Sequence, residues 1–440
     1  MRKADMNEIW GAEVLSKFNA KGLITQLDNN KIGRSVVEGF FGGTKEFNIR
    51  WEACIKKSTL SILEEHRRKS GGPELTTEQR KLLWAYGEPR NMKEALRSMS
   101  VVREMILLQE DVFTITSDIV DRYHADNVFY LEFRVKPCVS NELSPETFLR
   151  KMIQAIVVAR DTRRYMTIKI LIIVELENPI EVINEIVDLV MILGKTYRSR
   201  NLPDSDIIHG LEIAFSDSNK ISMDQLQKII DHIRRESQLI IVFNLAKINN
   251  SVDQLYDILL CRPDRLSNAE ILSTFNKNQN KIDQRILTDR LISTKLPIEF
   301  CYTANRLSCP SDKEPLWRNH FYYLYSMEYP IIPTTGYSGL LGCNLSDEYY
   351  HLAVNMNLKP SDLYKLSLTA SFLTEKTPRL SSRELFPFMQ QYDEFAKHYA
   401  LETSIDWKFQ ILRNCHFFLS RPLTARRKHR RRRIIDLLYS

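Results

Sequence analysis

Four short segments place charged or amide side chains in or directly after apolar, β-branched runs of the chain. They read NVFYLEFRVKP at residues 127–137, GLEIAFSD at 210–217, DRLSNA at 264–269 and EFCYTAN at 299–305. Carboxylate, guanidinium and amide groups can bind a polar ligand or move its protons once the fold brings them together. The chemistry therefore depends on the elements that position these segments.

Other common chemistries find no support in the sequence. The seven cysteines form no CxxC pair, and their odd number and spacing suit neither a disulfide framework nor a thiolate zinc site. No GxGxxG or GxxxxGK[ST] loop occurs, so a glycine-rich phosphate cradle is not expected.

Short β-branched runs alternate with amphipathic helical patterns along most of the chain, which is typical of βαβ units and a parallel sheet. Helices are expected at residues 92–108, 145–160, 180–198, 223–236 and 282–293. Strands are expected at residues 23–27, 128–134, 167–174, 207–214, 239–243, 265–266, 297–301 and 331–335. Eight strands with helices between most of them favour a TIM (β/α)8 barrel over an open doubly wound sheet.

The pattern divides the chain into three parts. The predicted barrel spans residues 1–375 and contains a polar insert near 68–84 that includes Gly-Gly-Pro, interpreted as a surface loop or a break between helices. Residues 376–425 form a predicted C-terminal helical extension. Residues 426–440 form a basic tail.

The net charge of +7 comes from that tail. It holds seven of the 62 Lys and Arg residues, so the rest of the chain has as many basic as acidic residues, 55 of each. The seven are Arg426, Arg427, Lys428, Arg430, Arg431, Arg432 and Arg433. Such a run is typical of a nuclear import signal or a nucleic-acid contact, and a merely solvated tail is the alternative.

The first residues lack the apolar core of a signal peptide, and no apolar run reaches the 18 residues of a membrane span. We therefore expect an intracellular protein, nuclear and/or cytoplasmic, with no membrane partner.

The four segments, in this order and spacing, resemble motifs of the adenosine deaminase family, and the similarity is closest to its adenosine deaminase-like branch, which deaminates N6-methyl-AMP. The resemblance covers roughly residues 15–375. It implies a barrel of the metal-dependent hydrolase type. It also implies a zinc ion held by an HxH pair on the first strand, a histidine on the fifth and an aspartate on the eighth.

Placed on this sequence, the family pattern puts the metal ligands at Ile24, Gln26, Asn244 and Gly336. The proton-transfer positions become Lys247 and Asn268, and the substrate-pocket positions become Phe215 and Tyr337. Without any alignment, no histidine precedes His66 or lies between His232 and His320. No Asp or Glu lies between Glu328 and Asp347. The expectation is a lost zinc site and no cofactor.

Three functions follow from these observations. The favoured one is a catalytically inactive, deaminase-like pseudoenzyme that serves as a scaffold for a protein partner of unknown identity. The alternatives are a zinc-dependent adenosine or N6-methyl-AMP deaminase and a non-catalytic purine nucleotide sensor. Purine nucleotide binding is possible but not favoured, because Phe215 and Tyr337 are expected to fill the pocket more readily than to stack on a base. Lys247 is expected to form a salt bridge or to contact a ligand.

Overall fold

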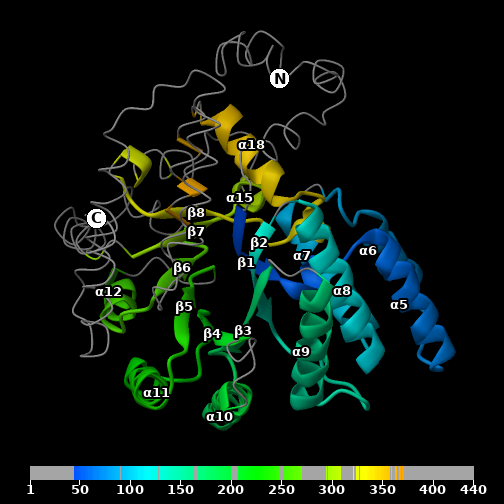
Figure 1. Cartoon of the computed structure of the whole chain (residues 1–440), viewed down its shortest axis with the longest axis horizontal. Coiled ribbons are helices and arrows are strands. Elements are labelled where there is room, and N and C mark those ends of the chain that lie inside the picture. Colours follow the sequence, from blue (N-terminus) through cyan, green and yellow to red (C-terminus); the bar gives the residue numbers. More distant parts are fainter. Residues whose placement is uncertain are drawn as a thin grey trace. The chain divides into compact units, whose positions relative to one another are not determined.

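A computed structural model gives the structure of the chain (Figure 1). It describes residues 44–370 except residues 90, 127, 163–165, 200–206, 247–251, 270–293, 295, 309–320, 322–323, 327, 357, 359–361, 364–365 and 368. Two compact units divide the chain: residues 45–348, which contain the sheet, and residues 1–44 together with 349–440.

The first of these units is built on one eight-stranded sheet whose spatial order follows the chain, β1 to β8. Each strand from β3 to β8 pairs in parallel with the one before it. A parallel bridge between Ile49 and Gly336 joins β1 to the segment after β8, so the sheet closes on itself. The predicted (β/α)8 barrel is confirmed. Its strands are β1 (Thr44–Arg50), β2 (Val128–Val135), β3 (Thr167–Glu175), β4 (Ile208–Ala214), β5 (Ile240–Asn244), β6 (Arg265–Ser267), β7 (Ile298–Phe300) and β8 (Ile331–Pro333).

Helices surround this sheet (Figure 1). Four predicted helices are confirmed within a few residues: α7 (Met92–Met105), α9 (Pro145–Thr162), α10 (Ile180–Ser199) and α11 (Met223–Glu236). The other elements are η1 (Trp51–Ala53), α5 (Lys57–Lys69), α6 (Thr77–Trp84), α8 (Gln109–Ala125), α12 (Val252–Leu260), α15 (Tyr302–Ser308), α17 (Ser338–Leu341) and α18 (Leu345–Asn355).

Hydrophobic periodicity explains why these segments pack as they do. In α11, Leu226, Ile229, Ile230 and Ile233 recur at helical spacing and are all buried against the sheet side. Ser222 caps this helix in a reciprocal hydrogen-bond pair with Gln225. Strand β3 is buried at every position except its two ends, as expected for a parallel strand covered on both faces.

The first strand of the barrel is Thr44–Arg50, so the prediction of a first strand at residues 23–27 is wrong. Residues 23–27 lie outside the described residues. In the sequence TKEFNIR, Phe47 and Ile49 are fully buried, and the side chains of Asn48 and Arg50 reach Ser267 and Glu212 on other strands of the barrel. The prediction followed the apolar run at residues 23–27, whereas the observed strand mixes polar and apolar residues.

The polar insert is a helical hairpin and less of a loop than predicted. Helix α5 ends at Lys69, and α6 begins at Thr77 behind a capping box formed by Thr76 and Gln79. Only the connection at residues 70–76 is irregular.

In the described part of the chain, Cys54, Cys138, Cys261, Cys301 and Cys343 are free and buried. No helix in the same part is long and apolar enough to span a membrane. The predicted helix at 282–293, the predicted C-terminal helical extension at 376–425 and the basic tail lie outside the described residues. The three-part division of the chain stays a prediction.

Candidate functional site

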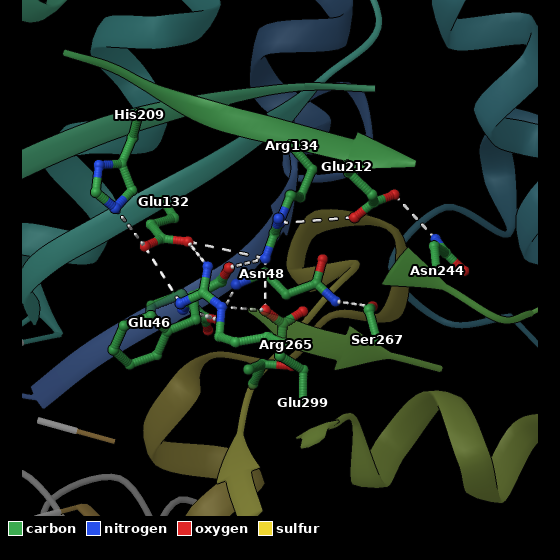
Figure 2. Close-up of polar contacts among 12 residues, drawn as sticks. Glu46, Asn48, Glu132, Arg134, His209, Glu212, Asn244, Arg265, Ser267 and Glu299 are labelled. Carbon is green, nitrogen blue, oxygen red and sulfur yellow. Dashed lines mark hydrogen bonds and ion pairs between the residues drawn. The ribbon is translucent and has the colours of Figure 1, made fainter. Parts of the chain in front are cut away.

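The interior of the barrel contains a layer of opposite charges that we call the inner ionic layer (Figure 2). It consists of Glu132 and Arg134 from β2, Glu212 from β4, Arg265 from β6 and Glu299 from β7. The two arginine side chains are at most 2% exposed, and the three carboxylates are fully buried. These five residues lie in the four segments that the sequence singled out.

Two guanidinium groups hold the three carboxylates of this layer together. Arg265 grips both oxygens of Glu132, and its Nε lies 3.2 Å from Oε1 of Glu299. Arg134 donates to Oε1 of Glu299 and to the Phe47 carbonyl at 2.9 Å, while its Nε lies 3.6 Å from Oε2 of Glu212. Buried charges are tolerated when they are paired in this way.

The environment splits the acidities of these carboxyl groups. Burial tends to raise the pKa of Glu132, but Arg265, His209 and Arg134 outweigh it and hold that pKa below its usual value. Burial dominates at Glu299 and raises its pKa to about 7, against the attraction of Arg134 and Arg265. Oε2 of Glu299 has no hydrogen-bond partner among the described residues, which disfavours the charged form in the same direction.

A second polar group lies at the carboxyl end of the strands, and we call it the mouth network. It runs through Arg50, Glu212, Asn244, Asn268, Ser267 and Asn48. Arg50 lies 3.2 Å from Glu212, Asn244 donates to Glu212 at 2.9 Å, and Asn268 donates to Asn244 at 3.0 Å. Asn268 also donates to Oγ of Ser267 at 3.4 Å, and Asn48 donates to that oxygen at 2.9 Å (Figure 2).

The network is buried on one side and accessible on the other. Asn48 and Asn244 are each 4% exposed, and Glu212 and Ser267 are fully buried. The Arg50 side chain is 16% exposed, and Asn268 and Tyr337 are half-buried. Asn268 has a left-handed backbone with φ of 51°, which an asparagine tolerates better than most residues. A ligand entering the mouth would therefore meet Arg50, Asn268 and Tyr337 first.

Arg50 is held as a cation. Burial opposes its charge, but Glu212, Tyr337, Glu52 and Glu175 outweigh that effect and raise its pKa above the ordinary value. Burial raises the pKa of the neighbouring Tyr337 hydroxyl despite the positive charge of Arg50. Among the described residues of the mouth, the positive charge of Arg50 is therefore paired with the buried Glu212 carboxylate and lies beside amide side chains.

A closed parallel barrel with helices around it and polar side chains at the carboxyl ends of its strands defines the class: a TIM-barrel protein. Solved structures share the fold. Arabidopsis ADAL complexed with IMP aligns with a TM-score of 0.65 at 18% identity, covering 82% of this chain and 99% of that one. An amidohydrolase from Burkholderia ambifaria with bound zinc aligns with a TM-score of 0.61 at 14% identity, covering 83% and 94%.

Comparison of the sequence with proteins of known name finds relatives among the N6-methyl-AMP deaminases. The bovine N6-methyl-AMP deaminase is 23% identical over 298 residues, which is 67% of this chain and 80% of that protein. No model of a protein family matches the chain. The resemblance to the adenosine deaminase family, on the side of its N6-methyl-AMP deaminase branch, is confirmed.

These relatives overturn the expectation of a catalytically inactive scaffold. The proteins that match over most of the chain carry the names of enzymes, N6-methyl-AMP deaminases from several animals. Nothing in the described residues establishes that this chain is inactive. The prediction of a pseudoenzyme without catalysis is wrong, and the alternative of a deaminase fits the relatives better.

The structure also moves two predicted ligand positions. The resemblance places a histidine pair on the inward face at the end of the first strand, and that strand is β1. The corresponding positions are Asn48 and Arg50, not Ile24 and Gln26, which lie outside the described residues. The sequence pattern that could have located β1 is its alternation of apolar and polar residues.

The other predicted positions fall on both sides of the strand ends. Asn244 ends β5, Asn268 follows β6, and Gly336 and Tyr337 follow β8, so these four lie around the mouth. Phe215 is buried and packs edge-on against Phe243, with ring centroids 5.0 Å apart. Because Asn244 points into the mouth, its neighbour Phe243 points to the opposite face of β5. Phe215 therefore packs toward the helices.

Lys247 and the basic tail, including Arg426 and Arg433, lie outside the described residues. Their roles as a ligand contact and as an import or nucleic-acid signal stay predictions, as does the protein partner.

The side chains at the mouth do not fit a zinc ion. The four positions carry two asparagines, an arginine and a glycine, whereas zinc prefers imidazole, thiolate and carboxylate. A guanidinium about 4 Å from another unit charge costs about 4 kcal/mol at an intermediate effective dielectric, and about twice that against a divalent ion. Among the described residues, no three His, Cys, Asp or Glu side chains are grouped so as to hold a metal.

Proposed function

We propose that the chain is a hydrolytic deaminase of purine nucleotides, with N6-methyl-AMP as its leading candidate substrate. The observation that carries the proposal is the similarity to bovine N6-methyl-AMP deaminase over 80% of that protein's length. In the proposed reaction, water provides the oxygen that becomes attached to C6 of the purine. The C6–N bond breaks, and the amine leaves with a proton from that water.

The mouth network provides the groups that would contact the substrate. Asn268 is half-buried, and its amide group can donate to and accept from the edge of a purine, as asparagine does with adenine elsewhere. Its Nδ2 is held by Asn244, which fixes the orientation of the amide. Tyr337 offers a half-buried ring beside Arg50. The donors described above do not fit zinc, so no step in this proposal passes through a metal.

The experiment is a product assay on the purified full-length chain. N6-methyl-AMP, AMP and adenosine are incubated separately with the protein, in chelator-treated buffer and in buffer supplemented with zinc. Liquid chromatography with mass detection measures IMP or inosine. We expect IMP from N6-methyl-AMP and a slower reaction, or none, with adenosine.

Two variants locate the reaction. Asn268→Ala should reduce turnover of N6-methyl-AMP, because it removes an amide proposed to contact the purine. Arg97→Ala, on the exposed face of α7 with a side chain 58% exposed, should leave turnover unchanged. Failure of the unmodified chain to convert any of the three compounds, in either buffer, would refute the proposed function.

A further inference from the structure

Arg50 ends β1 at the point where the sheet closes, and its guanidinium lies inside the mouth network. We propose that this guanidinium provides the positive charge of the mouth that a metal ion provides in zinc-containing barrels of this fold, so that the site binds its ligand without a metal. The inference deepens the proposed function by naming the charge at the same site. The metal content and ligand binding that test it can be measured without turnover.

The direction of the Arg50 side chain follows from the strand. Residues 48 and 50 share one face of β1, since side chains alternate along a strand. Asn48 contacts Ser267 on β6 at 2.9 Å, and Arg50 contacts Glu212 on β4 at 3.2 Å. Both partners belong to other strands of the barrel, which places this face of β1 toward the interior.

The charge of Arg50 is matched by one buried carboxylate. Glu212 is fully buried and receives Arg50 and Asn244 on the same oxygen, Oε1. Its other oxygen, Oε2, lies 3.6 Å from Nε of Arg134. The carboxylate is thus shared between the mouth and the inner ionic layer, and it anchors the guanidinium while leaving the Arg50 side chain 16% exposed. An exposed edge of a fixed cation is suited to a ligand.

The side-chain amides of Asn48 and Asn244 already form hydrogen bonds with other residues of the mouth network. The Nδ2 group of Asn244 donates to Glu212, and its Oδ1 accepts from Asn268 and from the backbone of Ala246. Asn48 donates to Ser267. A metal that recruited Oδ1 of Asn244 would have to break its hydrogen bonds with Asn268 and with the backbone of Ala246.

The closing segment also opposes a carboxylate ligand. Gly336 has φ of +66° and exchanges backbone hydrogen bonds with β1 on both sides, to Asn48 and Arg50 at 2.9 Å each. A Cβ atom there would lie 3.0 Å from Sγ of Cys301. A side chain at this position would be strained and crowded, so the position contributes space and not a ligand.

The ligand chemistry that suits Arg50 is an oxygen bearing negative charge, because a guanidinium offers directed N–H donors and no acceptor. Such an oxygen is present on the phosphate of a nucleotide. AMP carries this phosphate and adenosine does not, so the two ligands test the assignment.

The first test is the metal content of the full-length chain, produced in medium supplemented with zinc and measured by elemental analysis. We expect less than about one-tenth of an equivalent of zinc, since the donors at the mouth do not match its ligand preferences. Calorimetric titration of zinc into the protein should show no stoichiometric site. One equivalent of tightly held zinc would overturn the inference while leaving the proposed deaminase intact.

The second test measures binding of AMP and adenosine by calorimetry in chelator-treated buffer. We expect Arg50→Gln to weaken AMP binding roughly 10- to 100-fold, the effect of losing a hydrogen bond to a charged group, and Arg50→Lys to restore part of it. Arg97→Gln is the matched control and should bind as the unmodified chain does. Equal losses for AMP and adenosine would assign Arg50 to the purine, whereas a loss confined to AMP would assign it to the phosphate.

The two proposals fail separately. Zinc-free protein that binds AMP through Arg50 but converts nothing would support the inference and refute the deaminase. Binding that is unchanged in a folded Arg50→Gln variant, with a melting temperature close to the unmodified chain, would refute the role of Arg50. Should that variant not fold, the zinc content of the unmodified chain still decides whether the site is metal-free.

Discussion

The inner ionic layer and the mouth network lie on the same strands, yet they are built from different chemistry. The layer joins two arginines to three carboxylates that are fully buried. The mouth joins three asparagines and a serine to one cation, and part of it is accessible. Only Glu212 belongs to both.

The difference between the two regions shows which part of the molecule the sequence similarity describes. The segments that resemble the deaminase family supply Glu132, Arg134, Arg265 and Glu299, which hold the barrel together from inside. Several positions at which the chain departs from the family pattern, Asn48, Arg50 and Asn244 among them, lie at the mouth. The similarity to the family is therefore strongest in the inner ionic layer, and the chemistry has to be tested at the mouth network.

The largest effect is expected from removing a cation of the inner ionic layer. Arg265→Met leaves Glu132 and Glu299 buried with a guanidinium fewer, and breaking a buried ion pair in this way costs about 3–5 kcal/mol. Urea unfolding followed by circular dichroism measures the change. The control is Arg97→Met, whose partner Glu78 is 78% exposed and whose loss should cost less than about 1 kcal/mol. A similar cost for both variants would mean that the layer adds no stability beyond a surface pair.

The layer should also make stability depend on pH. The pKa of Glu299 is about 7 in the folded chain, and that of Glu348, a buried carboxyl on α18 that accepts from Thr303, is also about 7. The unfolded values lie near 4.5, so between these limits the folded chain binds more protons than the unfolded chain. Stability must then fall as pH rises, by up to about 1.4 kcal/mol per pH unit for each group.

Melting temperatures from pH 5 to pH 7.5 measure this dependence, which Glu299→Gln and Glu348→Gln should each flatten. Glu132 acts in the opposite sense, because its lowered pKa removes stability only at more acidic pH. A melting temperature that rises steadily over the range would contradict both raised pKa values.

At the mouth the effect of a single change should be smaller. Asn244→Leu removes one donor to Glu212 and the acceptor of Asn268, and leaving such buried partners unmet costs about 1–3 kcal/mol. Gln227→Leu, which removes an exposed hydrogen bond to Asp231, is the control and should cost less than about 0.5 kcal/mol. Urea unfolding serves again. A loss as large as that of Arg265→Met would erase the energetic distinction between the two regions.

The smallest effect tests the closure of the barrel at the mouth. Gly336→Ala should destabilise the chain by about 1–2 kcal/mol, because φ is +66° and the new Cβ would lie 3.0 Å from Sγ of Cys301. Gly71→Ala is matched in φ at +71° but has nothing within 4 Å of the new atom. The difference between their melting temperatures isolates the crowding at the mouth. No difference would show that Cys301 moves aside freely.

Much of the fold was predictable because several strands are continuous apolar runs rich in β-branched residues, as in TIKILIIVE of β3 and IIVFN of β5. The first strand was missed because Glu46, Asn48 and Arg50 interrupt its apolar residues, and continuous apolar runs were the criterion. That error misplaced half of the predicted ligand positions. The partners within the mouth network could not be predicted, since they depend on which strand ends meet across the barrel.

The seam between β1 and the segment after β8 has a consequence for how the chain reaches this structure. Arg50 and Asn48 exchange backbone hydrogen bonds with Gly336, a residue far along the chain. Contacts between residues so far apart in the sequence form slowly, because the entropy of closing a long loop is lost before the contacts stabilise the structure. During synthesis the first strand must wait, unpaired on one edge, until the ribosome has released residue 336. We expect ring closure to be the last step in assembling the barrel.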